Sequence, residues 1–232
     1  MIDFSAISVW EGESYRNITT CFPSQDLLDD LSLDESDKVV LQYWENKTSN
    51  IDHSIAQLNR VFQYGDTTST LAIFDQLQWN VGRFNTADFG VWYGALEAET
   101  SEIEALHWFY QHEKERLVYA KTDIHRDRKM FKAKIKAEQA FDLRARKEID
   151  QKQLISENYS YTQSLAQAAR ASGVELFLAP SARNLGGNCT PIFKREVIVE
   201  DQIIYYLRFT LTKQGEVYKT KQGIPQRVLL PA

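Results

Sequence analysis

Hydrophobic and polar residues alternate most regularly over residues 131–137, where phenylalanine, alanine and isoleucine are separated by lysines. A period of two places successive side chains on opposite faces of a strand, so this segment predicts a strand with one solvated face. Near the end of the chain, the largely apolar segment 203–211 and the short segment 216–218, Glu-Val-Tyr, flank a polar stretch that contains Gly215. Apolar runs separated by a glycine-containing turn predict a β-hairpin.

Apolar residues recur at helical spacing over residues 101–116 and 160–171. The hydroxyl of Thr100 is expected to cap the first helix, which would place Glu104 in its first turn. Gly173 is expected to end the second helix, because glycine readily adopts the left-handed backbone found at helix ends. Shorter helices are predicted from about residue 25, over residues 38–46 and over residues 53–62.

Further strands are predicted at residues 5–16, 89–93, 174–179 and 190–193. Residues 70–75 form a compact apolar segment, and Gly82 to Asn85 read as a turn. Strands and helices follow one another without a regular β-α-β rhythm. The chain is therefore predicted to be an α+β protein with a mixed or antiparallel sheet, flanking helices and a C-terminal β-hairpin.

The composition describes a chain that can build a core, because 43% of its 232 residues are hydrophobic. No run of eighteen apolar residues occurs, so no membrane span is expected. Residues 1–4 lack the basic and apolar parts of a secretion signal. Cys21 and Cys189 stand alone, without metal-ligand spacing. A cytoplasmic protein with reduced thiols and no bound metal is the expectation.

Residues 113–152 are rich in lysine and arginine. Such a stretch suggests either a nucleic-acid patch or the solvated face of a strand and helix. The basic residues alternate with apolar ones or lie among acids, which favours the solvated face. The net charge of −5 also argues against binding of nucleic acid by this chain alone.

Arg16 and Arg83 are candidate phosphate ligands, because a guanidinium makes fork-shaped contacts to phosphate oxygens and stays charged. Gly82 precedes Arg83 and lets the backbone bend close to a ligand. For each arginine the alternative is a surface pair with a carboxylate, and spacing alone favours that alternative.

Tyr93 and Glu104 are candidates for the reacting centre. A strand, turn and helix would bring both to one mouth, where the carboxylate can stabilise an oxocarbenium-like sugar. The alternative is a glutamate that complements the helix dipole. The neighbouring Glu97, Glu99 and Glu102 compete for either role, and periodicity does not choose among them.

Ser181 follows a short apolar strand and Pro180. No Gly-x-Ser-x-Gly elbow surrounds it, so a polar contact to a ligand is a better hypothesis than a nucleophile. The loop from Gly186 to Asn188 offers backbone amides and a side-chain amide for phosphate or nicotinamide. A simple connecting loop is the alternative reading of the same residues.

Taken in order along the chain, these motifs resemble the RES-domain family, which is named for an arginine, a glutamate and a serine. The ordered stretches that carry this resemblance, each present in the sequence, are Tyr15-Arg16, Phe22-Pro23, Gly82 to Asn85, Tyr93 to Glu104, Tyr159 to Tyr161 and Gly173 to Phe193. The chain departs from the family's commoner pattern at Phe84, Asn85 and His107. An acidic segment at about 24–70 and a tail at about 196–225 place it with the longer members.

The resemblance implies one RES-like domain over residues 1–232, with a core at about 5–195, a helical insert at about 24–70 and a hairpin extension at about 196–225. It implies an ADP-ribosyltransferase-like fold that binds NAD. Such proteins are typically toxins held by an Xre-like antitoxin. They cleave NAD, with water or inorganic phosphate as the acceptor, or transfer ADP-ribose to a macromolecule.

By position, the resemblance implies a role for six residues. Arg16 and Arg83 would bind the phosphates, Tyr93 would orient the nicotinamide ribose, and Glu104 would stabilise the cation. Ser181 would complete the pocket, and Asn188 would contribute from the loop. A non-catalytic binding module remains the alternative from another class of function.

Overall fold

The computed structural model describes residues 2–19, 72–74, 79–144 and 146–229. The helical insert at about 24–70 lies outside the described residues, and so do the three short helices predicted within it. Of the apolar segment 70–75, residues 72–74 are described and form the 3-10 helix η1 (Ala72–Phe74).

Among the residues described, eight strands form one mostly antiparallel sheet, in the order β1-β2-β5-β4-β3-β6-β7-β8. Their bounds are β1 (Ser8–Thr19), β2 (Trp92–Ala95), β3 (Ile124–Asp142), β4 (Leu176–Pro180), β5 (Asn188–Ile192), β6 (Ile198–Leu211), β7 (Val217–Lys221) and β8 (Ile224–Val228). Strand β1 also pairs with β3, so β1, β2, β5, β4 and β3 close into a ring. The only parallel pair is β3–β4 among the strands described. The predicted α+β class is confirmed.

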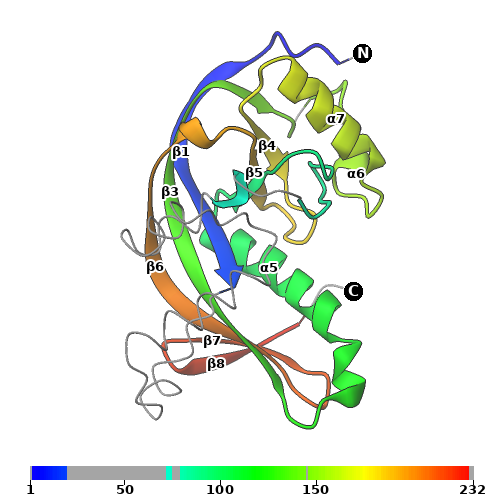
Figure 1. Ribbon diagram of the computed structural model, residues 1–232, viewed down its shortest axis with the longest axis vertical. Coiled ribbons are helices and arrows are strands. Elements are labelled where there is room, and N and C mark those ends of the chain that lie inside the picture. Colours follow the sequence, from blue (N-terminus) through cyan, green and yellow to red (C-terminus); the bar gives the residue numbers. More distant parts are fainter. Residues whose placement is uncertain (1, 20–71, 75–78, 145, 230–232) are drawn as a thin grey trace, which may run out of the picture.

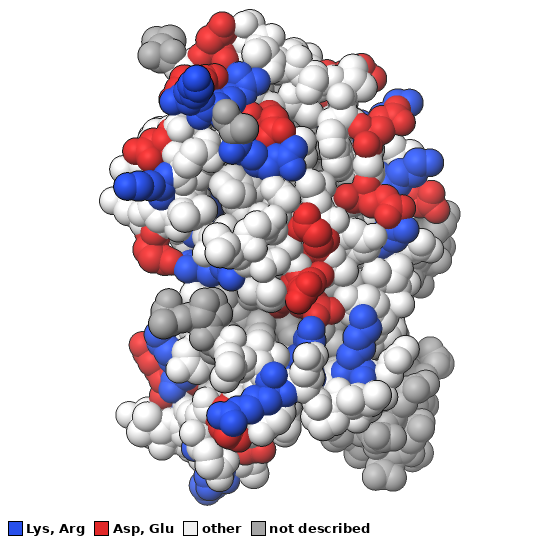
Figure 2. All heavy atoms as spheres, turned by 180° about the vertical axis from the view of Figure 1, so that it is seen from behind, with Lys and Arg blue, Asp and Glu red and all other residues white. Residues whose placement is uncertain are grey.

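Strand β3 confirms the alternation of hydrophobic and polar residues. Ala133, Ile135 and Ala137 are buried, whereas the lysines between them point outward. Lys132 pairs with Glu13 at 2.6 Å and Lys136 with Glu11 at 2.9 Å, both across to β1. Basic and acidic side chains are also interspersed over the face shown in Figure 2. This placement agrees with the solvated-face interpretation of the basic stretch.

The three α-helices that the structure describes occupy two regions of the molecule (Figure 1). Helix α5 (Ala98–Glu113) crosses the middle of the molecule, and α6 (Gln151–Leu154) and α7 (Ser160–Ala171) lie together at the end that holds β4. The short 3-10 helices are η2 (Arg116–Tyr119) and η3 (Arg195–Val197). No helix among the residues described is long and apolar enough to cross a membrane.

The start of α5 corrects one prediction. The helix begins at Ala98 with Glu97 as its N-cap, so Thr100 is not the cap and Glu104 lies in the second turn. The hydroxyl of Thr100 instead donates to Glu97 Oε2 at 2.7 Å. Helix α7 spans the predicted residues, and Gly173 follows it with a φ of +88°.

The predicted strand at 89–93 is displaced, because β2 begins at Trp92. Phe89 and Val91 pack instead into a cluster with Phe177 of β4. Trp92 to Ala95 pair with β5, which joins this part of the chain to the sheet. That pairing brings Tyr93 onto the wall described below.

The C-terminal hairpin is confirmed, with Gly215 in its turn at a φ of +84°. Strand β6 pairs with β3 over most of its length, and β8 adds a strand that the sequence pattern did not predict. Most of β8 is exposed and it contains Pro225, so it lacks the apolar alternation of a strand. Phe209 packs on Phe109 of α5, so the tail shares a core with the site-bearing helix.

Candidate functional site

A cavity of about 890 Å³ lies between the Gly82–Asn85 turn, β2, α5 and the segment that joins β4 to β5. Arg83, Tyr93 and Glu104 all line it. They come from a turn, a strand and a helix, and the closed ring of strands brings these elements together. The volume lies within the range of small-molecule sites.

The Gly82–Asn85 turn is locked from within the cavity. The amide of Gly82 donates to Asn85 O at 3.1 Å, which closes the turn. Tyr93 Oη accepts from the Phe84 amide at 2.8 Å and donates to Asn85 Oδ1 at 2.8 Å. A Cβ at position 82 would stand 2.7 Å from Tyr93 Oη, so this close approach needs glycine. Burial raises the pKa of Tyr93, so the hydroxyl stays protonated and can donate.

Arg83 projects from this turn against the connection between α6 and α7. Its Nη1 donates to Leu154 O at 3.1 Å and to Ser156 O at 2.5 Å. The guanidinium lies 4.8 Å from the centre of the Tyr159 ring. Within the described part of the chain no carboxylate pairs with Arg83, which sets it apart from the surface ion pair considered above.

Glu104 is held by one of its two oxygens. Oε1 accepts from Ser181 Oγ at 2.6 Å and from the Ala182 amide at 3.1 Å, and the Cys189 thiol lies 3.7 Å away. Oε2 makes no hydrogen bond to any residue that the structure describes. The carboxylate is therefore fixed in direction and keeps one oxygen for a ligand.

Ser181 lies behind Glu104. Its Oγ accepts from the amides of Arg183 at 3.2 Å and Asn184 at 2.9 Å while it donates to the carboxylate. Ser181 is not itself on the cavity wall, whereas its neighbours Pro180 and Ala182 are. Because Ser181 hydrogen-bonds Glu104 without reaching the cavity, its position suits orienting that carboxylate.

The other three glutamates are engaged elsewhere or exposed. Glu97 accepts from Asn188 and Thr100. Glu102 is buried and accepts from Tyr205 Oη at 2.6 Å and from Lys219 Nζ at 2.5 Å. Glu99 is exposed. Of these four glutamates, Glu104 is the one that lines the cavity.

Three of the predicted ligand-binding residues are not on the wall: Ser181, described above, Arg16 and Asn188. The guanidinium of Arg16 lies 5.4 Å from the centre of the Trp92 ring, and its buried Nη1 has no hydrogen-bond partner among the described residues. Burial lowers the pKa of Arg16 to about 10. Arg16 does not line the cavity, although the next residue, Asn17, does.

Asn188 ties its loop to α5. Its amide donates to Glu97 Oε2 at 3.0 Å, and its side-chain nitrogen donates to Glu97 Oε1 at 3.2 Å. The Gly187 amide donates to Asn184 O at 2.9 Å. The expectation that these two amides are open to a ligand is wrong, because both already donate within the protein.

The wall also contains residues that the candidate list omitted. Arg183, Tyr159 and Cys189 line the cavity, as does Arg128 of β3. Arg128 donates to Thr19 Oγ1 at 2.9 Å and to Asn17 O at 3.0 Å. Arg183 and Tyr159 stand in the stretches that carry the family resemblance, but only the fold shows that they face the cavity. Burial raises the pKa of the Cys189 thiol, and the negative charge of Glu104 raises it further.

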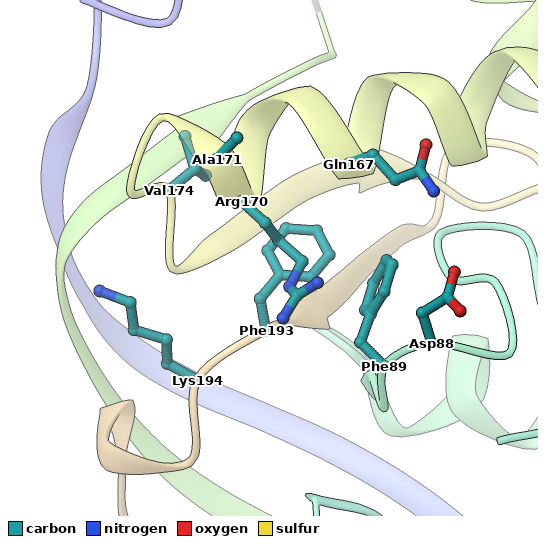
Figure 3. A pocket seen from close by; sticks show the side chains of 8 residues that line it. All are labelled: Asp88, Phe89, Gln167, Arg170, Ala171, Val174, Phe193 and Lys194. Atoms are coloured by element: carbon teal, nitrogen blue, oxygen red, sulfur yellow. The ribbon is translucent and has the colours of Figure 1, made fainter. Parts of the chain in front are cut away.

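A second cavity, of about 400 Å³, is shown in Figure 3. Arg170 extends from α7, and its guanidinium carbon lies 3.9 Å from the centre of the Phe89 ring. Lys194 on the rim pairs with Glu175 at 3.2 Å. No cluster of histidine, cysteine and acidic residues suited to a metal ion occurs in the ranges that the structure describes.

Comparison with known proteins gives one family. The family model described as the RES domain matches residues 58–212, of which 58–71, 75–78 and 145 lie outside the described residues. The match starts after Arg16 and includes Arg83, Glu104 and Ser181. The chain of a solved structure, the M. tuberculosis MbcT–MbcA toxin–antitoxin complex, is 13% identical, with 90% of this chain and 87% of that one covered and a TM-score of 0.46. No curated protein matches the chain.

Proposed function

Because the chain belongs to the RES-domain family, we propose that it is an enzyme that cleaves NAD at the bond between nicotinamide and ribose. The observation that carries the proposal is the carboxylate of Glu104, which is fixed through Oε1 by Ser181 and the Ala182 amide on the wall that also holds Arg83 and Tyr93. This is the arrangement that a developing sugar cation requires.

Cleavage begins when the electron pair of the glycosidic bond leaves with nicotinamide. Positive charge then develops at the anomeric carbon, and Glu104 stabilises it from the side that bears Oε2. A unit charge pair at about 4 Å contributes roughly 4 kcal/mol at an effective dielectric near 20. An oxygen of water or inorganic phosphate then bonds to the anomeric carbon. Water loses its proton to solvent in that step, and the product is ADP-ribose or its 1″-phosphate.

Binding rests on the arginine side of the cavity. Arg83 is presented by a turn that Tyr93 holds, and the carbonyl oxygens that it contacts carry no full charge to compete with a phosphate. Tyr93 and Tyr159 supply aromatic faces near the ribose and nicotinamide. Arg16 does not line the cavity but adds positive electrostatic potential near it. Asn188 holds the loop that joins β4 to β5 against the start of α5.

Phosphorus NMR of NAD incubated with the purified chain tests the reaction. Loss of the NAD signals with formation of ADP-ribose-1″-phosphate, dependent on added phosphate, identifies a phosphorylase. Formation of ADP-ribose in both conditions identifies a glycohydrolase. Unchanged NAD contradicts the proposal, unless labelled NAD incubated with lysate marks a macromolecule, which would identify an ADP-ribosyltransferase.

We also propose, on the family's typical role, that the chain is a toxin of the cytoplasm held by an Xre-like antitoxin. Induced expression in a bacterial host is then expected to lower cellular NAD and stop growth, and co-expression of the partner restores both. Growth arrest with undiminished NAD would contradict the link between the reaction and the role.

A further inference from the structure

Two arginines of the large cavity hold the same short segment, the connection between α6 and α7. Arg83 donates to the carbonyl oxygens of Leu154 and Ser156. Arg183 donates from Nη1 and Nη2 to the two carboxylate oxygens of Glu157, with 2.9 Å between Nη2 and Oε2. A single anionic side chain therefore occupies the fork of a cavity-lining arginine.

The two members of this pair differ in exposure. The Arg183 side chain is 11% exposed, whereas that of Glu157 is 68% exposed. Nε of Arg183 is buried and has no hydrogen-bond partner among the residues described. The guanidinium is thus built into the wall, while the carboxylate reaches it from a segment at the surface.

The surroundings of Glu157 are cationic. Its pKa is lowered mainly by the hydrogen bonds from Arg183, with smaller contributions from the charges of Arg183 and Arg83. Arg83 has no carboxylate partner in the described ranges, and its charge also acts on Glu157, which pairs with Arg183. A phosphate group presents oxygens that fit the same guanidinium fork.

We propose that Arg183 is a phosphate-binding residue of the cleft and that Glu157 occupies its fork until the diphosphate of the substrate displaces it. The identity of that substrate as NAD rests on the function proposed above. Release of Glu157 costs little because most of its carboxylate side is open to water, which weakens the ion pair. Glu157 then competes with the ligand for one guanidinium.

A purely structural ion pair is the alternative, and it predicts a different pattern. If the pair only pins the segment, loss of either partner loosens the same wall and weakens ligand binding. If Glu157 competes with the ligand, the two losses act in opposite directions. Glu157→Gln tightens binding, and Arg183→Gln weakens it.

Calorimetric titration of the full chain with inorganic pyrophosphate and with ADP-ribose tests the proposal. We expect Glu157→Gln to bind both about fivefold more tightly and Arg183→Gln to bind both about tenfold more weakly. Glu148→Gln is the matched control, because Glu148 also pairs with an arginine at 3.2 Å, but that arginine, Arg146, does not line the cavity as Arg183 does. It is expected to bind as the unmodified chain does.

Unchanged or weaker pyrophosphate binding by Glu157→Gln, in protein with an unchanged melting temperature, overturns the proposal. If Arg183→Gln does not fold, the Glu157→Gln titration alone decides. If the chain cleaves NAD but Glu157→Gln does not bind more tightly and Arg183→Gln more weakly, competition by Glu157 is rejected and the proposed function remains. The predicted order in a protein that does not cleave NAD supports the anion site and rejects the reaction.

Discussion

Both cavities hold an arginine that stacks on an aromatic ring, yet they differ in what else stands on the wall. In the larger cavity Arg83 lies over Tyr159, and the carboxylate of Glu104 is fixed by a hydroxyl and an amide. In the smaller cavity Arg170 lies over Phe89 (Figure 3). The acid that lines this cavity, Asp88, is exposed and accepts a hydrogen bond from Thr86. An arginine on a ring is common surface packing. A carboxylate aimed by its own partners is what distinguishes a candidate reaction centre.

The largest expected effect is at that carboxylate. Glu104→Gln is predicted to lower kcat for NAD cleavage by about 100- to 1000-fold, because the neutral amide no longer stabilises the sugar cation. Glu99→Gln is the matched control, since Glu99 lies on the same helix and is exposed. Nicotinamide release measured by chromatography compares them. Equal rates for the two variants would remove Glu104 from the reaction.

A second prediction contrasts the two arginines directly. Arg83→Gln is predicted to lower kcat/KM for NAD by about 10- to 100-fold, because a hydrogen bond to a charged phosphate is lost. The same substitution at Arg170 removes an equally stacked guanidinium from the smaller cavity and is expected to leave kcat/KM unchanged. If Arg170→Gln has the larger effect, the two cavities have been assigned the wrong way round.

Tyr93→Phe is predicted to affect both stability and rate. It leaves the Phe84 amide and Asn85 Oδ1 without their partner, which costs about 1–3 kcal/mol of unfolding free energy. The turn that presents Arg83 loosens, so kcat/KM is expected to fall about tenfold. Tyr218→Phe loses one hydrogen bond to Glu216 and is the control. Urea unfolding should separate the two variants, and equal midpoints would show that the turn does not depend on Tyr93.

The smallest effect concerns Cys189. Because burial and the charge of Glu104 raise the pKa of this thiol, little thiolate exists in the folded protein at pH 8, whereas the unfolded chain has more. Iodoacetamide is therefore expected to modify the peptide containing Cys189 slowly until denaturant is added. Mass spectrometry of that peptide measures the rate. Alkylation as fast in the folded as in the unfolded protein would contradict the enclosed site.

Local patterns predicted the elements that local forces determine. The alternation along β3 and the span of α7 with Gly173 were read correctly from periodicity and end signals. The start of α5 was misplaced because Glu97 is held by Asn188, a partner 91 residues away. Strand β8 was missed because it pairs at an exposed edge and needs no apolar face.

The site divides in the same way. Arg83, Tyr93 and Glu104 were named from an ordered set of motifs, and the cavity includes all three. Asn188 and Arg16 were named with them, but neither lines the cavity. Asn188 instead binds Glu97, and Arg16 packs on Trp92. Arg183 was overlooked because only the fold shows that it lines the cavity and pairs with a carboxylate from another loop. Which way a side chain points depends on contacts distant in sequence.

The most direct test is a crystal structure of the Glu104→Gln variant with NAD, since that variant is expected to bind NAD and to cleave it only slowly. The account predicts NAD in the larger cavity, with the nicotinamide ribose beside residue 104 and the diphosphate beside Arg83 and Arg183. NAD bound in the smaller cavity near Arg170, or with its diphosphate away from both arginines, would contradict it.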